Sequence, residues 1–215
     1  MSIEWHVFLG LVLLSYISPG PDTVMVLRAS ARGNRIGFLA AAGALTGLTV
    51  HMMVSAVGLS ALLVALPGSL TVLTLLGALY LAYLGVRAIL ASGQMRRDAK
   101  EGLAGAAPLD GEKLGRAAFQ RTLITNLANP KVILFFVAVL PQFIDASSTW
   151  PVALQLGVLG ALDVLVGVFY LPLFVLFGAR IFRGIGGRGL ANLELCVGLL
   201  LLIFAGVLVY DTFVG

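Results

Sequence analysis

The sequence predicts an all-α integral membrane protein with six transmembrane helices. Of its 215 residues, 60% are hydrophobic and only 11% are charged, whereas a soluble domain carries about 25% charged residues. Six apolar runs approach or exceed the roughly 20 residues that a helix needs to cross a bilayer. These runs are Ile3–Leu27, Ile36–Ala65, Leu70–Ala91, Thr122–Pro141, Val152–Gly178 and Leu190–Phe213.

The first run is interrupted by Pro19, Gly20 and Pro21, and the acid Asp22 follows at once. Proline lacks a backbone donor and glycine disfavours a helix, so we expect the first helix to be broken here. In hydrocarbon, irregular backbone and a carboxylate persist only where protein or a watery cavity satisfies them. The run lacks a basic start, so we expect it to remain as helix one and not to be cleaved as a signal peptide.

The second and fourth runs carry polar side chains far from their ends. His51 lies in the middle of the second run, and the fourth run contains Asn126. Asn129-Pro130 forms a second break in the fourth run, and Lys131 follows it. Asn129 has both donors and acceptors, so one expected role is to satisfy the carbonyl groups that Pro130 frees. We therefore expect helices one and four both to be broken at Pro or Gly.

Asp163 lies near the centre of the fifth run with apolar neighbours on both sides. An acid at that depth costs about 2.5–3.5 kcal/mol on insertion scales, and no helix start nearby gives it a capping role. We therefore expect Asp163 to exchange protons or to bind a cation, with a structural salt bridge as the alternative.

The basic residues indicate which side of the membrane each connection occupies. Thirteen of the fourteen lie in or beside three connections: Arg28, Arg32, Arg35; Arg87, Arg96, Arg97, Lys100, Lys113, Arg116, Arg121; and Arg180, Arg183, Arg188. The positive-inside rule makes these loops cytoplasmic and places both termini outside. This distribution also explains the net charge of +4 without nucleic acid as a partner.

Two groups of three helices flank one long hydrophilic segment. We expect residues 1–91 and 122–215 to be three-helix repeats of one transporter domain, and 92–121 to be a flexible cytoplasmic linker. An odd number of helices places the second repeat upside down in the membrane. Three correspondences support this inverted repeat: Pro19 with Pro130, His51 with Asp163, and Gly77/Gly85 with Gly198/Gly206. Paired helix breaks in two such halves indicate a transporter's binding site.

The polar residues leave several roles open. Asp22 either caps the helix that restarts after the break, or binds a proton or an ammonium group, and the two roles are compatible. Lys131 either extends towards the membrane surface, pairs with Asp22 or Asp163, or binds a substrate carboxylate. His51 is either a satisfied buried group or part of a proton relay. The glycine faces of helices three and six fit internal packing or the seam of a homodimer.

Two motifs resemble those of the LysE/RhtB-type family of bacterial amino-acid exporters. The first is Pro19-Gly20-Pro21-Asp22, and the second is Asn129-Pro130-Lys131 followed by Phe135-Phe136 and Pro141-Gln142-Phe143. The resemblance extends over essentially the whole chain. It implies multi-pass insertion in the bacterial plasma membrane and export of amino acids or related metabolites, driven by the proton gradient. It implies no cofactor.

A mechanism of alternating access follows from these expectations, with the cavity formed by helices one, two, four and five. The substrate carboxylate would meet Lys131 or a half-helix N-terminus, and its ammonium would meet Asp22 or Asp163. A metal or cation exporter is the closest alternative, although two histidines and a single cysteine make soft-metal ligation poor. An intramembrane enzyme is disfavoured, since Ser60 lacks a complete nucleophile motif and a His-Glu-x-x-His motif is absent.

Overall fold

The computed structural model describes every residue except 1–3, 19, 67, 99–110, 146 and 215, and the described chain is almost entirely helical, with no strand. Pro19, one of the expected break residues, lies outside the described part. The elements are α1 (Trp5–Ile17), α2 (Pro21–Ser30), α3 (Asn34–Val54), η1 (Ser55–Leu59, π-helical), α4 (Ser60–Ala65), α5 (Ser69–Asp98), α6 (Gly111–Leu127), α7 (Pro130–Leu134), η2 (Phe135–Val139, π-helical), η3 (Leu140–Phe143, 3-10) and α8 (Val152–Val214).

The described helices contain four to six candidate membrane spans, which confirms the all-helical membrane fold. Four are continuous: Asn34–Ala65, Thr71–Gly93, Val152–Gly178 and Ala191–Tyr210. Two more result when each bent pair of helices is one span. Trp5–Ile17 and Pro21–Ser30 meet at 55°, and Leu114–Leu127 and Pro130–Phe143 meet at 48°. Both bends fall at the proline and glycine positions that the sequence marks as helix breaks.

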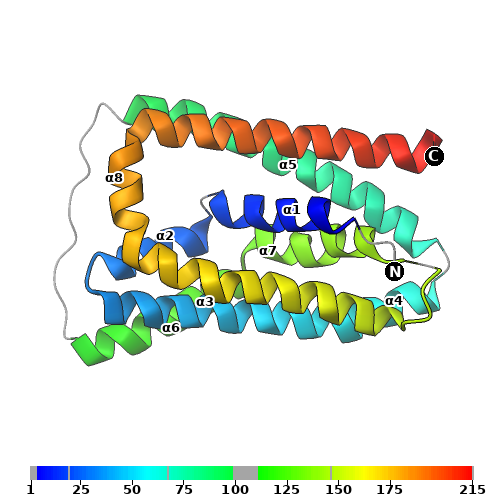
Figure 1. The fold of residues 1–215 in the computed structure, drawn as a ribbon, viewed down its shortest axis with the longest axis horizontal. Coiled ribbons are helices and arrows are strands. Elements are labelled where there is room, and N and C mark those ends of the chain that lie inside the picture. Colours follow the sequence, from blue (N-terminus) through cyan, green and yellow to red (C-terminus); the bar gives the residue numbers. More distant parts are fainter. Residues whose placement is uncertain (1–3, 19, 67, 99–110, 146, 215) are drawn as a thin grey trace.

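The helix boundaries differ from the sequence expectation in two regions. Helix α5 continues to Asp98 and α6 begins at Gly111, so helix extends into both ends of the segment expected to be a linker. The fifth and sixth runs are not separate helices but belong to one long helix, α8, which bends between two nearly antiparallel arms (Figure 1). Four glycines lie in residues 184–189 between the arms, and glycine is a common cause of sharp helix kinks.

The two broken helices lie in the middle of the bundle. In Figure 1, α1 and α7 run between α5 with the second arm of α8 on one side and α3, α6 and the first arm of α8 on the other. Gly85 on α5 and Gly198 on α8 let two of these helices approach closely. A Cβ atom built on Gly85 would lie 2.8 Å from the carbonyl oxygen of Gly198. This glycine pair therefore serves internal packing, one of the two roles that the sequence left open.

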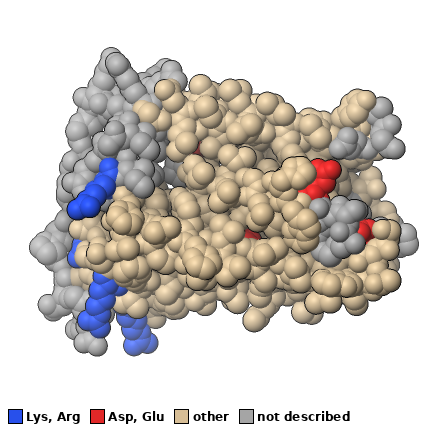
Figure 2. Space-filling view, viewed as in Figure 1, with Lys and Arg blue, Asp and Glu red and all other residues tan. Residues whose placement is uncertain are grey.

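Charge is distributed unevenly along the bundle. Figure 2 shows the basic side chains at one end of the visible face, where α8 bends and α3 begins (Figure 1). The two chain ends lie at the opposite end of the molecule (Figure 1). Whether the two halves form an inverted repeat stays a prediction.

Candidate functional site

The two helix breaks, at Gly20 and at Asn129-Pro130, meet in the centre of the bundle, and we call this place the crossing. Gly20, which precedes α2, is buried. A Cβ atom built on it would lie 2.8 Å from Asp22 Oδ1, 3.5 Å from Lys131 Nζ and 3.7 Å from Asn129 Nδ2. Residues more than 100 positions apart in the sequence therefore surround one glycine. The absence of a side chain at Gly20 leaves the room in which these polar groups gather.

Asp22 links α2 to α6. Its Oδ1 accepts a hydrogen bond from the Thr23 amide at 2.9 Å, and its Oδ2 accepts one from Asn126 Nδ2 at 3.0 Å. Asn126 is fully buried, and its backbone oxygen lies 3.3 Å from His51 Nε2. These contacts form a continuous polar chain from His51 through Asn126 to Asp22. Asp22 thus accepts a hydrogen bond from an amide in the first turn of α2, where amides have no helical partner. Its second oxygen binds Asn126 of α6, in the other half of the chain.

Lys131 joins the second break to the first. Its ammonium donates to the backbone oxygen of Ser18 at 2.8 Å and also to that of Ser15. Carbonyl groups at the end of α1 have no partners further along the helix and carry the negative end of its dipole, so a cation is favoured there. At the start of α7, Asn129 Oδ1 accepts the Lys131 amide at 3.0 Å, and Pro130 occupies the first turn, where no backbone donor is needed.

Asp163 lies beside this crossing but forms fewer contacts. Its side chain is 2% exposed, and its Oδ2 has no hydrogen-bond partner among the described residues. Its backbone oxygen accepts the Tyr16 hydroxyl at 3.0 Å. Asp163, Asp22 and Lys131 all line one small cavity of about 30 Å³. A water needs about 10–15 Å³ by such a measure, so this inner cavity has room for only two or three waters.

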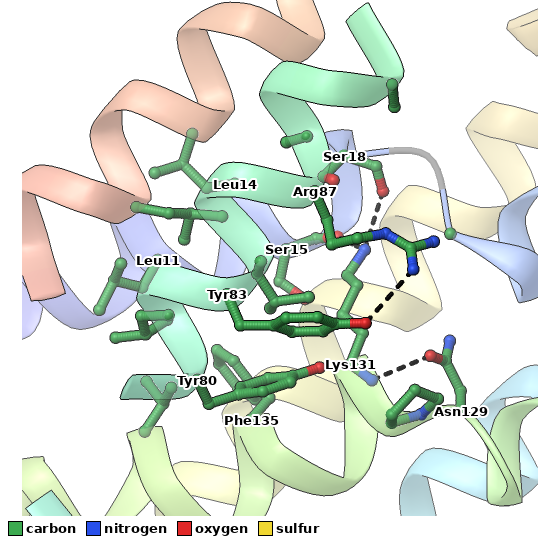
Figure 3. Close-up of a pocket in the computed structure, with 18 of the residues that line it drawn as sticks. Leu11, Leu14, Ser15, Ser18, Tyr80, Tyr83, Arg87, Asn129, Lys131 and Phe135 are labelled. Carbon is green, nitrogen blue, oxygen red and sulfur yellow. Dashed lines mark hydrogen bonds between the residues drawn. The ribbon is translucent and has the colours of Figure 1, made fainter. Parts of the chain in front are cut away.

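A larger cavity of about 240 Å³ lies on the other side of Lys131. It is lined mainly by α1, α5, the α7 break and the second arm of α8, and Tyr83 and Arg87 on its wall are exposed. Lys131, Ser15 and Phe135 line both cavities. Its polar lining includes Tyr80, Tyr83, Arg87, Asn129 and Glu194. Figure 3 shows the two tyrosine rings one above the other, with the Arg87 guanidinium at the Tyr83 hydroxyl.

The crossing gathers most of the residues that the sequence singled out. Asp22, Asn126, Asn129 and Lys131 lie at or beside it, and Asp163 shares the inner cavity with Asp22. His51 reaches the group through the backbone of Asn126 and lines neither of these cavities.

Sequence reasoning missed Glu194 and Arg87 as site residues. Glu194 is an acid within a long apolar run, the same signal that marked Asp163, and it is only 5% exposed. Arg87 lies near the end of its apolar run, where the sequence alone indicates a loop charge. Its place on the wall of a cavity depends on the tertiary structure.

No three His, Cys, Asp or Glu side chains within the described ranges are arranged so that they could hold a metal ion. Lys131 supplies a cation instead: it lines the inner cavity together with Asp22 and Asp163, and the larger cavity together with Glu194.

Comparison with known proteins gives one consistent result. Residues 13–212 match the family model described as LysE type translocator. The chain is 36% identical to an uncharacterized membrane protein of Pseudomonas aeruginosa over 82% of this chain and 80% of the relative. It is 31% identical to a leucine efflux protein of Salmonella typhimurium (86% and 82% covered) and 32% identical to one of Enterobacter sp. (83% and 81% covered). No solved structure matches it significantly.

Proposed function

Because the chain belongs to the LysE-type translocator family, a family of multi-pass membrane proteins, we propose that it is a secondary active exporter of amino acids. Relatives that are 31% and 32% identical are named leucine efflux proteins. Leucine and similar aliphatic amino acids are therefore the first substrates to test. Its role is transport and not catalysis.

The meeting of the two helix breaks supports this proposal most directly. Transporters bind substrates and coupling ions where discontinuous helices expose half-helix ends near the middle of the membrane. Here the start of α2, the start of α7 and the end of α1 lie within hydrogen-bonding reach of Asp22, Asn129 and Lys131. Alternating access would take place around this crossing.

Proton antiport is the proposed driving force. Asp22 and Asp163 are carboxyl groups in one cavity large enough for water, and Lys131 lies beside both. Protonation of an acid in this cavity removes a negative charge next to Lys131 and weakens the attraction that holds the two broken helices together. One proton that moves down a potential of 100 mV supplies about 2.3 kcal/mol. That energy supports a roughly fifty-fold accumulation of substrate.

Reconstituted transport tests this function. The purified protein in liposomes would be loaded with labelled amino acids, and efflux would be measured with and without an imposed pH gradient. We expect the gradient to drive efflux by the wild type, and Asp22→Asn and Asp163→Asn to abolish the response to the gradient. Gradient-driven efflux that is undiminished in both variants would refute proton coupling through these acids. Efflux of divalent metals without efflux of any amino acid would favour the cation-exporter alternative.

We further propose that the basic end of the bundle faces the cytoplasm and that both chain ends lie outside. Single cysteines test this orientation in a Cys196→Ser background. A membrane-impermeant thiol reagent applied to intact cells should label Ser147→Cys, in the loop before α8, and should not label Arg32→Cys, between α2 and α3. The reverse labelling pattern would invert the proposed topology.

A further inference from the structure

The larger cavity contains several polar groups that lack partners within the protein. Tyr80, Asn129 and Glu194 line it, and each is buried. In the described part of the chain, the Tyr80 hydroxyl, Asn129 Nδ2 and Glu194 Oε2 have no hydrogen-bond partner. A buried polar atom without a partner costs about 1–3 kcal/mol. Three such atoms around one cavity therefore point to a ligand that supplies the missing partners.

Arg87 adds a positive charge to the same cavity wall. Its Nη1 donates to the Tyr83 hydroxyl at 3.3 Å, and its guanidinium carbon lies 5.9 Å from the centre of the Tyr83 ring. The Tyr83 ring stacks in turn on Tyr80, with centroids 5.9 Å apart. These contacts orient the guanidinium, and a guanidinium binds a carboxylate through two parallel hydrogen bonds.

The chemistry of these groups divides into two kinds. Arg87 and Asn129 Nδ2 are donors, which suit a carboxylate. Glu194 Oε2 is an acceptor, and a carboxylate oxygen suits an ammonium group. An α-amino acid carries one carboxylate and one ammonium. The cavity therefore offers a complementary partner for each end of a zwitterion.

The rest of the lining suits an apolar side chain. Leu11 and Leu14 of α1, Leu84 of α5 and Leu201 of α8 line the same cavity. The volume of this cavity is about 240 Å³. That is just below the usual range of roughly 300–1,000 Å³ for ligand pockets, so the cavity suits a small metabolite. The inner cavity of about 30 Å³ that contains Asp22 and Asp163 is far too small for an amino acid.

We propose that the larger cavity is the substrate site, that Arg87 and Asn129 bind the α-carboxylate, and that Glu194 binds the α-ammonium of an aliphatic amino acid. This inference rests on the proposed export function. It places substrate and proton in separate cavities, with Lys131 forming part of the wall of both. Glu194 thereby takes the role that the sequence assigned to Asp22 or Asp163 for the substrate ammonium. The two ligands then influence each other through Lys131 and do not compete for one carboxylate.

Competition binding with leucine analogues tests the assignment of each end. Binding of labelled leucine to the purified protein would be competed with leucinamide, which lacks the carboxylate, and with 4-methylpentanoate, which lacks the ammonium. We expect the wild type to prefer leucine to both. Arg87→Gln should lose roughly 10- to 100-fold of the preference over leucinamide and keep the preference over 4-methylpentanoate. Glu194→Gln should give the opposite result.

Matched controls are Arg28→Gln and Glu4→Gln, which remove the same charges from exposed residues that line neither cavity. Both should keep the wild-type preferences. If Arg87→Gln and Glu194→Gln also keep both preferences for leucine, the assignment of the substrate site is overturned. Efflux of leucine by the wild type would in that case still support the proposed function. A wild type that neither binds nor exports any amino acid would overturn both.

A second measurement does not depend on whether the charge variants fold. Leu84→Cys places a thiol on the cavity wall, in a Cys196→Ser background with Arg87 and Glu194 intact. Leucine should slow the reaction of this thiol with a small methanethiosulfonate reagent, and 4-methylpentanoate at the same concentration should not. Equal reaction rates with and without leucine would contradict a substrate site in this cavity.

Discussion

Substitution of Gly20 by alanine adds one methyl group where the two broken helices cross. It tests whether stability and transport depend on the close packing there. Gly20 has φ −104° and ψ 175°, an extended conformation that alanine adopts without strain. Alanine also lowers the entropy of the unfolded chain, which would stabilise the protein by about 0.4–1 kcal/mol, so a loss of stability must come from the space around the residue. The new Cβ would lie 2.8 Å from Asp22 Oδ1, a distance that real Cβ atoms essentially never show, and 3.5 Å from Lys131 Nζ.

The expected loss of stability in Gly20→Ala follows from the hydrogen bonds of Asp22 that the new methyl group disturbs. Its carboxylate has to move by about 0.7 Å, from 2.8 Å to an ordinary contact distance of roughly 3.5 Å. That movement disturbs the bond from the Thr23 amide, at 2.9 Å, and the bond from Asn126, at 3.0 Å. A hydrogen bond to a charged group is worth about 1.5–3 kcal/mol. Partial loss of both bonds predicts a destabilisation of about 1–3 kcal/mol.

Gly10 is the matched control. It lies within α1, and a Cβ built on it meets nothing within 4 Å. Gly10→Ala should keep or slightly raise stability, since alanine favours a helix over glycine by about 1 kcal/mol. Thermal unfolding of the purified variants in detergent and leucine efflux from liposomes would measure both properties. We expect Gly20→Ala alone to lower the unfolding temperature and to reduce efflux by roughly tenfold or more.

Equal stability and efflux in the two alanine variants would refute this reasoning. That result would mean that the polar groups around Gly20 rearrange freely, so their positions in the structure would not explain transport. A loss of stability in Gly20→Ala with wild-type efflux would separate the two roles, and the crossing would then be a structural junction only.

Three further predictions concern the packing and the second break. Gly85→Ala should destabilise the protein by about 1–3 kcal/mol because its Cβ would lie 2.8 Å from the Gly198 oxygen. Gly206→Ala meets nothing within 4 Å and, like Gly10→Ala, should keep or slightly raise stability in the same unfolding assay. Asn129→Ala should lower stability by about 1 kcal/mol through loss of the cap on α7, and Asn129→Asp should retain the cap; equal unfolding temperatures would contradict this. Lys131→Met leaves two carbonyl oxygens at the end of α1 without their donor and should lower stability by several kcal/mol; an unfolding temperature as high as that of the wild type would contradict it.

Much of the fold could be predicted because membrane insertion constrains local sequence strongly. A span needs about 20 apolar residues, and a proline removes a backbone donor wherever it occurs. Both are properties of the chain itself, so the apolar runs and the two bends were accessible without a structure. The ends of the helices were harder to predict from the sequence. Helix α6 begins at Gly111 and not near Thr122, since a helix that projects beyond the apolar core no longer needs an apolar sequence.

The sequence by itself determined the class of the protein, its helix breaks and the residue types that gather there, including Asp22, Asn129 and Lys131. Only the tertiary structure decided that the two breaks meet around Gly20 and that Lys131 lies between two cavities of different size. It alone placed Arg87 and Glu194 on the wall of the larger one. The physical reason is that hydropathy records how deep a residue lies in the membrane, whereas a binding site depends on which helix faces pack together.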